Sequence, residues 1–228
     1  MSEKHSKISV VIPALNEEGC IGEVIAKARP FCDEIIVVDG HSEDRTRRIA
    51  GDAGARVILD NRKGKGEAIR HAVKFAEGEV IVFIDADGSH DPQDIPRLLE
   101  PILQGRADHV SGSRLIGGSS ELHGGFGECF RLMGSSFITA CINWRFKVRL
   151  SESQNGFRAI RTDVIKQLGL QENITTIEQE MIIKTLKRGF RMVEVPTHEH
   201  RRKSGYSKID LKKVWLRYVY SFIKYLFF

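Results

Sequence analysis

The chain has 228 residues but no run of about 18 uncharged apolar residues, so the sequence predicts no helix that clearly spans a membrane. It has four cysteines, and none forms a Cys-x-x-Cys pair, which disfavours a zinc site and indicates free thiols in a reducing compartment. The sequence also lacks a Gly-x-Ser-x-Gly motif and a Cys–His arrangement, so nothing indicates covalent catalysis. No long hydrophobic segment precedes the first apolar strand, and we therefore expect no signal peptide.

Net positive charge is concentrated near the C-terminus, because acids balance the basic residues in the rest of the chain. The net charge is +5, and residues 198–228 carry eight Lys and Arg against two acids, which leaves the rest at −1. A nearly neutral body lacks the spread basic face of a nucleic-acid-binding protein, so we expect no nucleic acid as a partner. A basic tail instead predicts an anionic partner that binds near the C-terminus.

The spacing of apolar residues predicts an α/β fold. Short apolar runs of strand length occur at residues 8–12, 34–38, 56–59, 80–84, 109–111 and 190–195, with a further strand near the end of 151–161. Helical segments separate the first four, which indicates a mostly parallel, Rossmann-like sheet flanked by helices. The loops after these strands then meet at one edge of the sheet, where open α/β sheets bind ligands.

Two polar side chains are expected to begin the first two helices. Asn16 precedes the acids Glu17 and Glu18, so it is predicted to cap a helix that runs to about residue 29. Ser42 is predicted to open a second helix that runs to about residue 53.

A pair of acids, Asp85 and Asp87, follows the apolar strand at 80–84 and precedes Gly88. Because they are two residues apart, both carboxylates can reach one point beyond the strand's carboxyl end. Two oxygen ligands there suit a Mg²⁺ or Mn²⁺ ion that also holds substrate phosphates. Paired acids at strand ends are also common as solvated turns, so neighbouring residues must decide between the two interpretations.

Asp39 ends another apolar strand, next to Gly40. A carboxylate at this position can accept a hydrogen bond from a nucleobase N–H or a ribose hydroxyl, although a simple turn acid is the alternative. Lys65 lies in a loop with two glycines before a helix, where backbone N–H groups and a lysine suit a phosphate. The loop lacks the spacing and the Ser/Thr of a Walker A motif, and a solvated basic turn is the alternative.

Arg202 and Lys208 lie in the basic segment 201–208, around Gly205. Such a loop is a candidate clamp on a leaving diphosphate or an anionic acceptor. A solvated run of charges is the alternative.

The last segment, 209–228, is predicted to be an amphipathic helix appended to a domain at 1–208. Its apolar side is predicted to carry Leu211, Trp215, Tyr218, Val219, Phe222 and Leu226. Its other side is predicted to carry Lys213, Arg217 and Lys224. A basic helix with aromatic flanks is typical of a membrane interface. A helix packed on the body or on a second subunit is the alternative.

Several segments together resemble family-2 glycosyltransferases of the GT-A fold, and most closely dolichyl-phosphate or polyprenyl-phosphate mannose synthases. The resemblance covers about residues 7 to 208. The segments that carry it are VVIPALNEE (10–18), IIVVDGHSEDRT (35–46), KGKGEAI (63–69), VFIDADGSHDP (82–92), SGSR (111–114), QNGFRAIR (154–161), EQEM (178–181) and RRKSGYSK (201–208).

The resemblance implies a role for each matching residue. The nucleoside would be held by Pro13, Leu15, Glu17 and Asp39, and the metal ion and donor diphosphate by Asp85 and Asp87. Residues at the sugar and phosphates would include Arg114, Arg202 and Lys208, with Glu180 as the acid of a later helix. The acceptor phosphate would contact Arg131 and Ser135.

Three positions depart from the family pattern. Gly40 stands where a second acid often follows Asp39, and Ser89 stands where a glutamine often supplies a further metal ligand. Glu152 replaces a usual aspartate. These departures leave the donor base open among GDP-mannose, UDP-glucose and UDP-N-acetylhexosamines.

The resemblance implies an inverting, metal-dependent transfer of a hexose from a nucleotide sugar, with GDP-mannose favoured, to a polyprenyl or dolichyl phosphate. A phosphate acceptor is already an anion and needs no strong base, whereas a hydroxyl acceptor would need one, with Glu180 the first candidate. The expected location is cytoplasmic, peripheral on the cytoplasmic face of a membrane. The alternatives are a UDP-sugar-dependent transferase to a lipid phosphate or a soluble hydroxyl, and a non-catalytic nucleotide-sugar-binding module.

Overall fold

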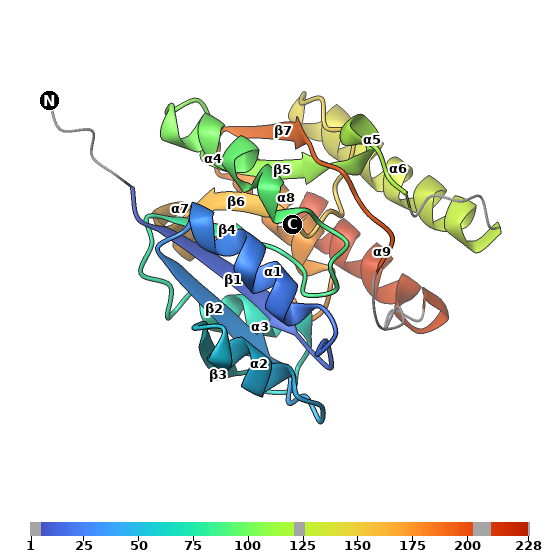
Figure 1. The fold of residues 1–228 in the computed structure, drawn as a ribbon. Helices are drawn as coiled ribbons and strands as arrows, with labels where there is room; N and C mark the ends of the chain where they lie inside the picture. Colours follow the sequence, from blue (N-terminus) through green and yellow to red (C-terminus); the bar gives the residue numbers. More distant parts are fainter. Residues whose placement is uncertain (1–5, 121–125, 203–210, 228) are drawn as a thin grey trace, which may run out of the picture.

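The computed structural model describes residues 6–120, 126–202 and 211–227, with side chains except at 126–131 and 211–215. Its centre is a seven-stranded sheet in the order β3-β2-β1-β4-β6-β5-β7 (Figure 1). The strands are β1 (Ile8–Ala14), β2 (Glu34–Asp39), β3 (Arg56–Leu59), β4 (Val80–Phe83), β5 (His109–Ser113), β6 (Arg158–Arg161) and β7 (Met192–Pro196). Within these residues β6 alone runs antiparallel to its neighbours, so the predicted mostly parallel sheet is confirmed.

Helices cover both faces of the sheet. They are α1 (Ile21–Ala28), α2 (Thr46–Asp52), α3 (Lys65–Ala72), α4 (Ile95–Leu103), α5 (Arg114–Gly117), α6 (Phe126–Phe146), α7 (Thr162–Leu168), α8 (Ile177–Lys187) and α9 (Leu211–Phe227), with 3-10 turns η1 (Arg29–Phe31) and η2 (Pro92–Asp94). Alternate strand residues point to opposite faces. Val10 and Ile12 of β1 therefore pack against α1 and α4, whereas Val11 packs against α3, α7 and α8.

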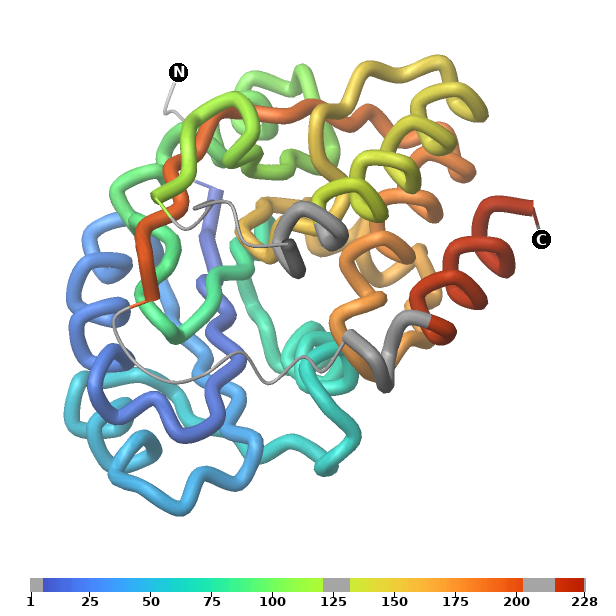
Figure 2. Tube along the Cα trace, turned by 90° about the vertical axis from the view of Figure 1, so that its right-hand side faces the viewer, coloured from blue at the N-terminus to red at the C-terminus, as the bar shows by residue number. Residues whose placement is uncertain are grey.

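A third apolar cluster joins α6, α8 and α9 beside the sheet. Figure 2 shows these three helices together on one side of the molecule, opposite α1 and α2. Phe222 and Leu226 of α9 are buried in this cluster. Arg217 and Tyr225 of α9 also donate hydrogen bonds to the buried carboxylate of Glu172, at 3.1 and 3.2 Å. The last helix is therefore packed on the body along part of its surface.

The predicted apolar side of α9 is wrong in part. Phe222 and Leu226 were assigned to the membrane but lie in the protein core. The apolar residues that α9 exposes are Leu216, Val219, Tyr220, Ile223 and Phe227. The helix carries one apolar surface that packs on the body and a second, adjacent one that is exposed. The sequence prediction treated both as a single apolar side. Of the described helices, none has both the length and the apolar content needed to cross a membrane.

The first two helices begin about four residues later than predicted, because their expected caps bind elsewhere. The Asn16 side chain accepts a hydrogen bond from the backbone N–H of Glu43 at 2.8 Å. In return, the Ser42 hydroxyl accepts one from the backbone N–H of Asn16 at 2.9 Å. Each side chain thus joins the two loops at the sheet edge instead of starting its own helix, and these loops are fixed against each other.

Candidate active site

The predicted ligand edge is formed where the central parallel strands end. Ala14 of β1 lies opposite Asp39 of β2 in the strand register. Asp85 follows β4, which pairs with β1 on its other side. Asp39 and Asp85 therefore lie on the same edge of the sheet, on strands that flank β1.

Asp39 is completely buried, and its two carboxylate oxygens have different surroundings. Its Oδ2 atom accepts a hydrogen bond from the backbone N–H of Ser42 at 2.9 Å and lies 3.4 Å from Nε of Arg47. Its Oδ1 atom is buried and has no hydrogen-bond partner among the residues that the structure describes. A buried oxygen without a donor is rare in folded proteins and often marks a ligand contact.

The other residues assigned to the nucleoside surround Asp39. Leu15 is 37% exposed, and a Cβ atom at Gly40 would lie 3.4 Å from its Cβ. Pro13 lies opposite Val38 of β2. The backbone N–H of Glu17 donates to Thr46 at 2.8 Å, which fixes this loop beside α2. The structure thus brings Pro13, Leu15, Glu17 and Asp39 to one corner of the edge, and their contact with a nucleoside stays a prediction.

Lys65 lies between two carboxylates at the start of α3. Its Nζ atom is 2.6 Å from Oδ1 of Asp85 and 2.9 Å from Oε1 of Glu178. Burial opposes the charge of Lys65, but these two acids outweigh it and raise the pKa of the ammonium. Burial likewise opposes the charge of Asp85, but Lys65 and His90 hold the pKa of that carboxyl below its usual value. Lys65 and Asp85 are therefore both charged at neutral pH.

Gly156 makes room for this cluster. A Cβ atom at position 156 would lie 2.8 Å from Oδ2 of Asp85 and 2.9 Å from Nζ of Lys65. Both distances are shorter than a carbon atom tolerates, so a side chain here would displace the ion pair. This packing explains the glycine in the QNGFR segment.

Glu178 lies in the site, and the predicted Glu180 does not. Both oxygens of Glu180 accept backbone hydrogen bonds, from Gln171 and Glu172 at 2.8 Å each, and Lys184 lies 2.7 Å away. Residues two apart on a helix point to nearly opposite sides. The assignment of Glu180 as a base near the reacting atoms is therefore corrected: Glu180 holds the loop before α8, and Glu178 faces Lys65.

Arg158 is a further buried cation that the sequence reasoning did not assign. Its guanidinium donates to the backbone carbonyl oxygens of Asn155 and Glu178, the latter at 3.1 Å. Burial lowers the pKa of Arg158, and the nearby acids Glu178 and Asp85 oppose that shift. Arg158 thus fixes the backbone on which Glu178 lies and adds positive charge beneath the two acids. The QNGFR segment was the available signal.

The Asp87 carboxylate is held in place by Ser89 on one oxygen and by Arg202 on the other. Its Oδ1 atom accepts hydrogen bonds from the backbone N–H and the hydroxyl of Ser89, at 3.0 and 2.7 Å. Its Oδ2 atom lies 3.2 Å from Nε of Arg202. Ser89, which departs from the family pattern, therefore orients Asp87. Of the residues predicted to meet the diphosphate, Arg202 is brought to this edge, and Lys208 lies outside the described residues.

The acids at this edge fit a divalent metal ion that is shared with a substrate. Asp85 and Asp87 provide carboxylate oxygens, the donor type that Mg²⁺ and Mn²⁺ prefer. No group of three or more His, Cys, Asp or Glu in the described parts of the chain could enclose a metal ion. Phosphate oxygens of a diphosphate are of the same donor type and could complete the coordination of such an ion.

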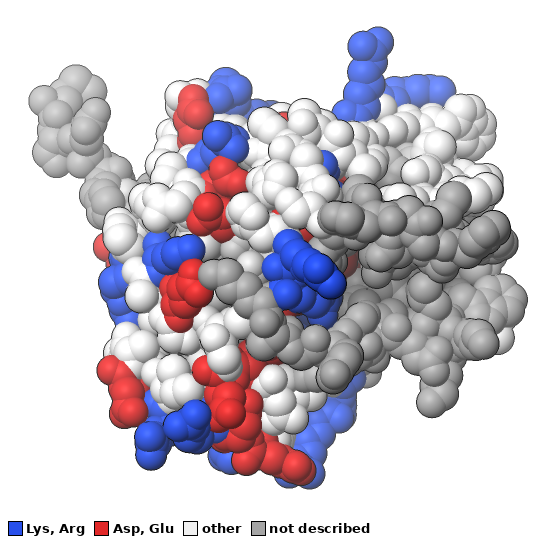
Figure 3. Space-filling model, turned by 45° about the vertical axis from the view of Figure 1, so that its right-hand side comes forward, with Lys and Arg blue, Asp and Glu red and all other residues white. Residues whose placement is uncertain are grey.

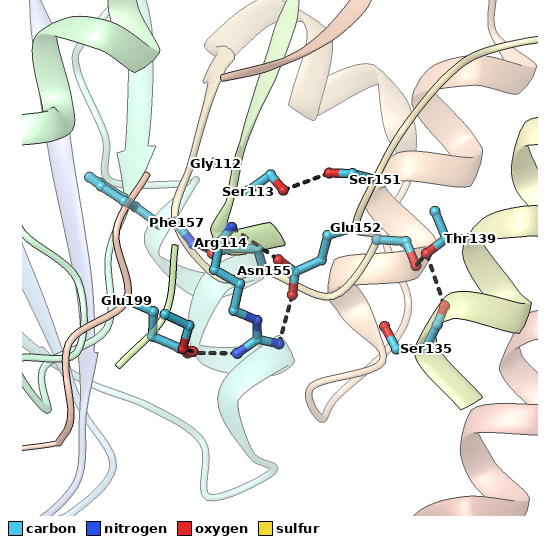
Figure 4. A network of polar contacts seen from close by, with 12 residues as sticks. Gly112, Ser113, Arg114, Ser135, Thr139, Ser151, Glu152, Asn155, Phe157 and Glu199 are labelled. Atoms are coloured by element: carbon cyan, nitrogen blue, oxygen red, sulfur yellow. Dashed lines mark hydrogen bonds and ion pairs between the residues drawn. The ribbon is translucent and has the colours of Figure 1, made fainter. Parts of the chain in front are cut away.

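Arg114 is held between two acids near the end of β5, as Figure 4 shows. Its Nη2 and Nη1 atoms lie 2.6 Å from Oε1 of Glu152 and Oε1 of Glu199, respectively. Burial raises the pKa of Glu152, while Arg114 opposes the shift. Ser119 also donates to Glu199, at 2.8 Å. The positive charge of Arg114 is therefore balanced locally, so Arg114 contributes little net charge to an incoming anion.

Hydroxyl groups connect this cluster to α6. The Thr139 hydroxyl donates to the backbone carbonyl of Ser135 at 2.9 Å and shares a hydrogen bond with the Ser153 hydroxyl at 2.8 Å. Figure 4 shows Ser135 and Thr139 on the side of Glu152 away from Glu199. Ser135 is thus near the cluster, whereas the Arg131 side chain is outside the described side chains. Contact of either residue with an acceptor stays a prediction.

Acidic and basic side chains are interspersed over the coloured atoms of the face in Figure 3. A group of basic side chains near the centre of this face adjoins the atoms drawn in grey. Positive charge on this face is thus local, which suits a small anionic group better than an extended polyanion.

Comparison with known proteins agrees with this geometry. Residues 9–169 match the family described as Glycosyl transferase family 2. A glycosyltransferase of Haloferax volcanii, AglJ, is 30% identical over 87% of this chain and 64% of its own length. A dolichyl-phosphate hexose transferase of the same organism is 32% identical over 89% of this chain and 86% of its own length. The chain spans about half to two thirds of the length of the first curated relatives.

A solved structure shares the fold. Glucosyl-3-phosphoglycerate synthase from Mycobacterium tuberculosis, in complex with Mn²⁺, uridine diphosphate and glucosyl-3-phosphoglycerate, superposes with a TM-score of 0.79. The match covers 98% of this chain and 81% of that chain, at 23% identity. Together with the match over residues 9–169, it shows that the chain has the GT-A fold and belongs to glycosyl transferase family 2.

Proposed function

We propose that the protein transfers a hexose from a nucleotide sugar to a polyprenyl or dolichyl phosphate with inversion of configuration. The observation that carries the proposal is the Asp85–Asp87 pair, set between Lys65 and Arg202 on the same sheet edge as Asp39. The name of the dolichyl-phosphate hexose transferase among the relatives supports the lipid acceptor. The resemblance favours GDP-mannose as the donor, with UDP-hexoses as the alternative.

The charged residues of the edge suit stabilisation of a leaving diphosphate. A divalent cation held by Asp85 and Asp87 would neutralise part of the phosphate charge. Ser89 keeps the Asp87 carboxylate in place, and Arg202 is positioned to move its guanidinium from Asp87 to an adjacent phosphate oxygen. A fixed positive charge at a departing anion lowers the barrier to transfer.

The geometry also favours an acceptor that is already an anion. Glu180, the candidate base for a hydroxyl acceptor, has both oxygens bound to backbone N–H groups away from the acidic pair. Glu178 is bound to Lys65, and Glu152 is bound to Arg114. A lipid phosphate needs none of them as a base, because its oxygen is largely deprotonated at neutral pH.

Two neighbouring helices offer a surface for the membrane that would contain such an acceptor. We define this surface by the exposed residues Met133, Phe137 and Trp144 of α6 and Leu216, Val219, Tyr220, Ile223 and Phe227 of α9. Lys147 lies over the Trp144 ring at 5.7 Å. Exposed aromatic and basic residues together are typical of a membrane interface. We place the protein on the cytoplasmic face of a membrane, where nucleotide sugars are available.

The proposal is tested by measuring lipid-linked hexose formed from GDP-mannose, UDP-glucose or UDP-N-acetylglucosamine with polyprenyl phosphate and Mn²⁺. Wild-type protein should form an organic-soluble product with one donor, and Asp87→Asn should reduce the rate by about 100-fold or more. Asp52→Asn is the control, because that acid is 76% exposed on α2. Transfer only to soluble hydroxyl acceptors would refute the lipid acceptor, and no transfer with any donor would refute the transferase function.

A further inference from the structure

The loop formed by residues 171–176 lies between α9 and the start of α3, the helix that carries Lys65. The loop also leads directly into α8, which carries Glu178. We propose that Glu172 is a positioning residue of the donor site, because it joins α9 to the loop that holds Lys65 and Glu178 beside Asp85. The role at a donor site rests on the proposed function, whereas the contacts themselves do not.

The carboxylate of Glu172 connects this loop to α9. Its Oε2 atom lies 3.0 Å from Nη2 of Arg217 and accepts a hydrogen bond from the Thr176 hydroxyl at 2.6 Å. Its Oε1 atom accepts a hydrogen bond from the Tyr225 hydroxyl at 3.2 Å. Burial opposes the charge of Glu172, but the hydrogen bonds from Thr176 and Arg217 outweigh it and lower the pKa of that carboxyl. A buried, charged group with partners on both elements therefore fixes the loop against α9.

The next residue, Asn173, holds the start of α3. Its backbone carbonyl accepts hydrogen bonds from the backbone N–H groups of Gly66 and Glu67, at 2.8 and 3.1 Å. Its side-chain oxygen accepts one from Arg70. The first N–H groups of a helix lack partners within that helix, and here the loop supplies the partner. Backbone N–H groups at this position were expected to suit a phosphate, but those of Gly66 and Glu67 bind Asn173 instead.

Glycine at positions 64 and 66 permits the close contact between the loop and α3. A Cβ atom at Gly66 would lie 2.6 Å from the backbone carbonyl oxygens of both Glu172 and Ile174. A Cβ atom at Gly64 would lie 2.8 Å from the carbonyl oxygen of Asn173. A carbon atom does not tolerate these distances, so a side chain at either position would push the loop and α3 apart.

Two charged residues at the sheet edge depend on the placement of this loop. Lys65 immediately precedes Gly66, and its Nζ atom lies 2.6 Å from Oδ1 of Asp85. Glu178 lies in the first turn of α8 and accepts a hydrogen bond from Lys65 at 2.9 Å. A shift of the loop relative to α3 would separate Lys65 from Glu178, and Asp85 would lose the cation that orients it. A contact made on α9 is thus connected through Glu172 to an acid of the predicted metal site.

Arg217→Met tests this connection without altering the loop, α3 or the acids at the sheet edge. The backbone amides of Gly66 and Glu67 should exchange hydrogen about tenfold faster, measured by NMR, because the loop that protects them is less firmly held. Arg217→Lys keeps the positive charge and should restore most of the protection. Arg191→Met is the matched control: Arg191 is a similarly exposed arginine that donates to the nearly buried Asp108, at the amino ends of β5 and β7. It should lower Tm and leave the exchange of both amides unchanged.

Calorimetric binding of UDP and GDP with Mn²⁺, without lipid, measures the effect on the site in the same variants. Arg217→Met should weaken binding of the diphosphate that wild type prefers by about fivefold to tenfold, and Arg217→Lys should restore it. Arg191→Met should leave this affinity unchanged. A merely structural role for the contact would lower Tm alone, since binding is measured well below the unfolding temperature.

Gly66→Ala alters the other end of the connection. Alanine favours a helix over glycine, so helix propensity alone predicts a more stable α3. Contact with the loop predicts the opposite, together with weaker diphosphate binding. Gly51→Ala in α2 is the matched control, because no described neighbour lies within 4 Å of a Cβ atom there, and it should leave binding unchanged.

The outcomes separate this inference from the proposed function. Unchanged amide exchange in Arg217→Met, or the same change in both arginine variants, would overturn the positioning role. Faster exchange at unchanged diphosphate affinity would also overturn it, because the loop would then matter only for folding. No binding of either diphosphate to wild type would overturn the proposed function and with it any role at a donor site, while the exchange rates would still decide whether the connection exists. Faster exchange and weaker binding in Arg217→Met, both restored by Arg217→Lys, would support the inference.

Discussion

Lys65→Met tests the buried ion pair at the centre of the site. The side chains of Lys65 and Asp85 are 23% and 26% exposed, and the variant leaves Asp85 and Glu178 facing each other without a cation. Removing one partner of a buried pair typically costs about 3–5 kcal/mol, and partial exposure places the expected loss at the lower end, about 3 kcal/mol. In a chain of this size, that corresponds to a decrease in Tm of about 6–12 °C.

The matched control is Lys7→Met. Lys7 lies 2.6 Å from Glu77, the same distance as in the Lys65–Asp85 pair, but both partners are largely exposed. Surface pairs contribute little, so the control should leave Tm nearly unchanged. The comparison therefore contrasts a buried lysine between two acids with an exposed lysine beside one, at the same distance and with the same substitution.

The decrease in Tm caused by Lys65→Met should depend on pH. The lowered pKa of Asp85 stabilises wild type above the unfolded-state pKa of an aspartate, about 3.9, and this contribution is lost as the pH falls through the folded value. The raised pKa of Lys65 keeps it charged throughout this range. In the variant, the two unpaired acids can relieve their repulsion by protonation as the pH falls.

Thermal unfolding of wild type and both variants, followed by circular dichroism from pH 4 to pH 8, measures these differences. The difference in Tm between wild type and Lys65→Met should be largest near pH 7–8 and narrow below about pH 5. Equal Tm values for the two variants at pH 7 would refute the reasoning. A difference in Tm between wild type and Lys65→Met that grows towards pH 4 would also refute it.

Three further predictions concern transfer, membrane binding and metal. Glu178→Gln should slow hexose transfer by about tenfold or more, because it removes one of the two acids that hold Lys65 beside Asp85, whereas Glu180→Gln should mainly lower Tm, because Glu180 binds backbone N–H groups. The reverse pattern would place Glu180 in the site. Ile223→Glu should reduce liposome flotation and Leu103→Glu, on α4, should not, although both residues are exposed; equal flotation of both variants would contradict the membrane surface. Chelation by EDTA should abolish transfer and Mn²⁺ should restore it, while Asp87→Ala should weaken Mn²⁺ binding measured by electron paramagnetic resonance in the presence of UDP; unchanged Mn²⁺ binding would exclude Asp87 as a ligand.

The sheet and its ligand edge could be predicted from the sequence because apolar runs mark buried strands directly. Strands at 34–39, 56–59 and 80–83 lie within one residue of the prediction. Their order also places Asp39 and Asp85 at one edge, since parallel strands must end on the same side. The strands and the position of the sheet edge depend on the local pattern of apolar residues and on the direction of the chain, and both can be read from a single sequence.

Features that depend on side-chain partners were less predictable. Asn16 and Ser42 are good helix caps in isolation, but each binds the opposite loop, and no local pattern reveals that exchange. The choice between Glu178 and Glu180 depends on the rotation of α8 relative to Lys65, which a motif does not fix. The helix α7 was not predicted, because its seven residues follow β6 directly without a separating loop.

The burial of α9 on the body has a mechanical consequence for the proposed binding to a bilayer. Phe222, Tyr225 and Leu226 would be uncovered if the helix detached, so α9 is not a flexible tether. A membrane that binds its exposed residues holds the whole folded body as one rigid object. In the proposed membrane-bound state, the fold itself would set the height and tilt of the Asp85–Asp87 pair above the lipid head groups, and the lipid acceptor would have to diffuse to that fixed position.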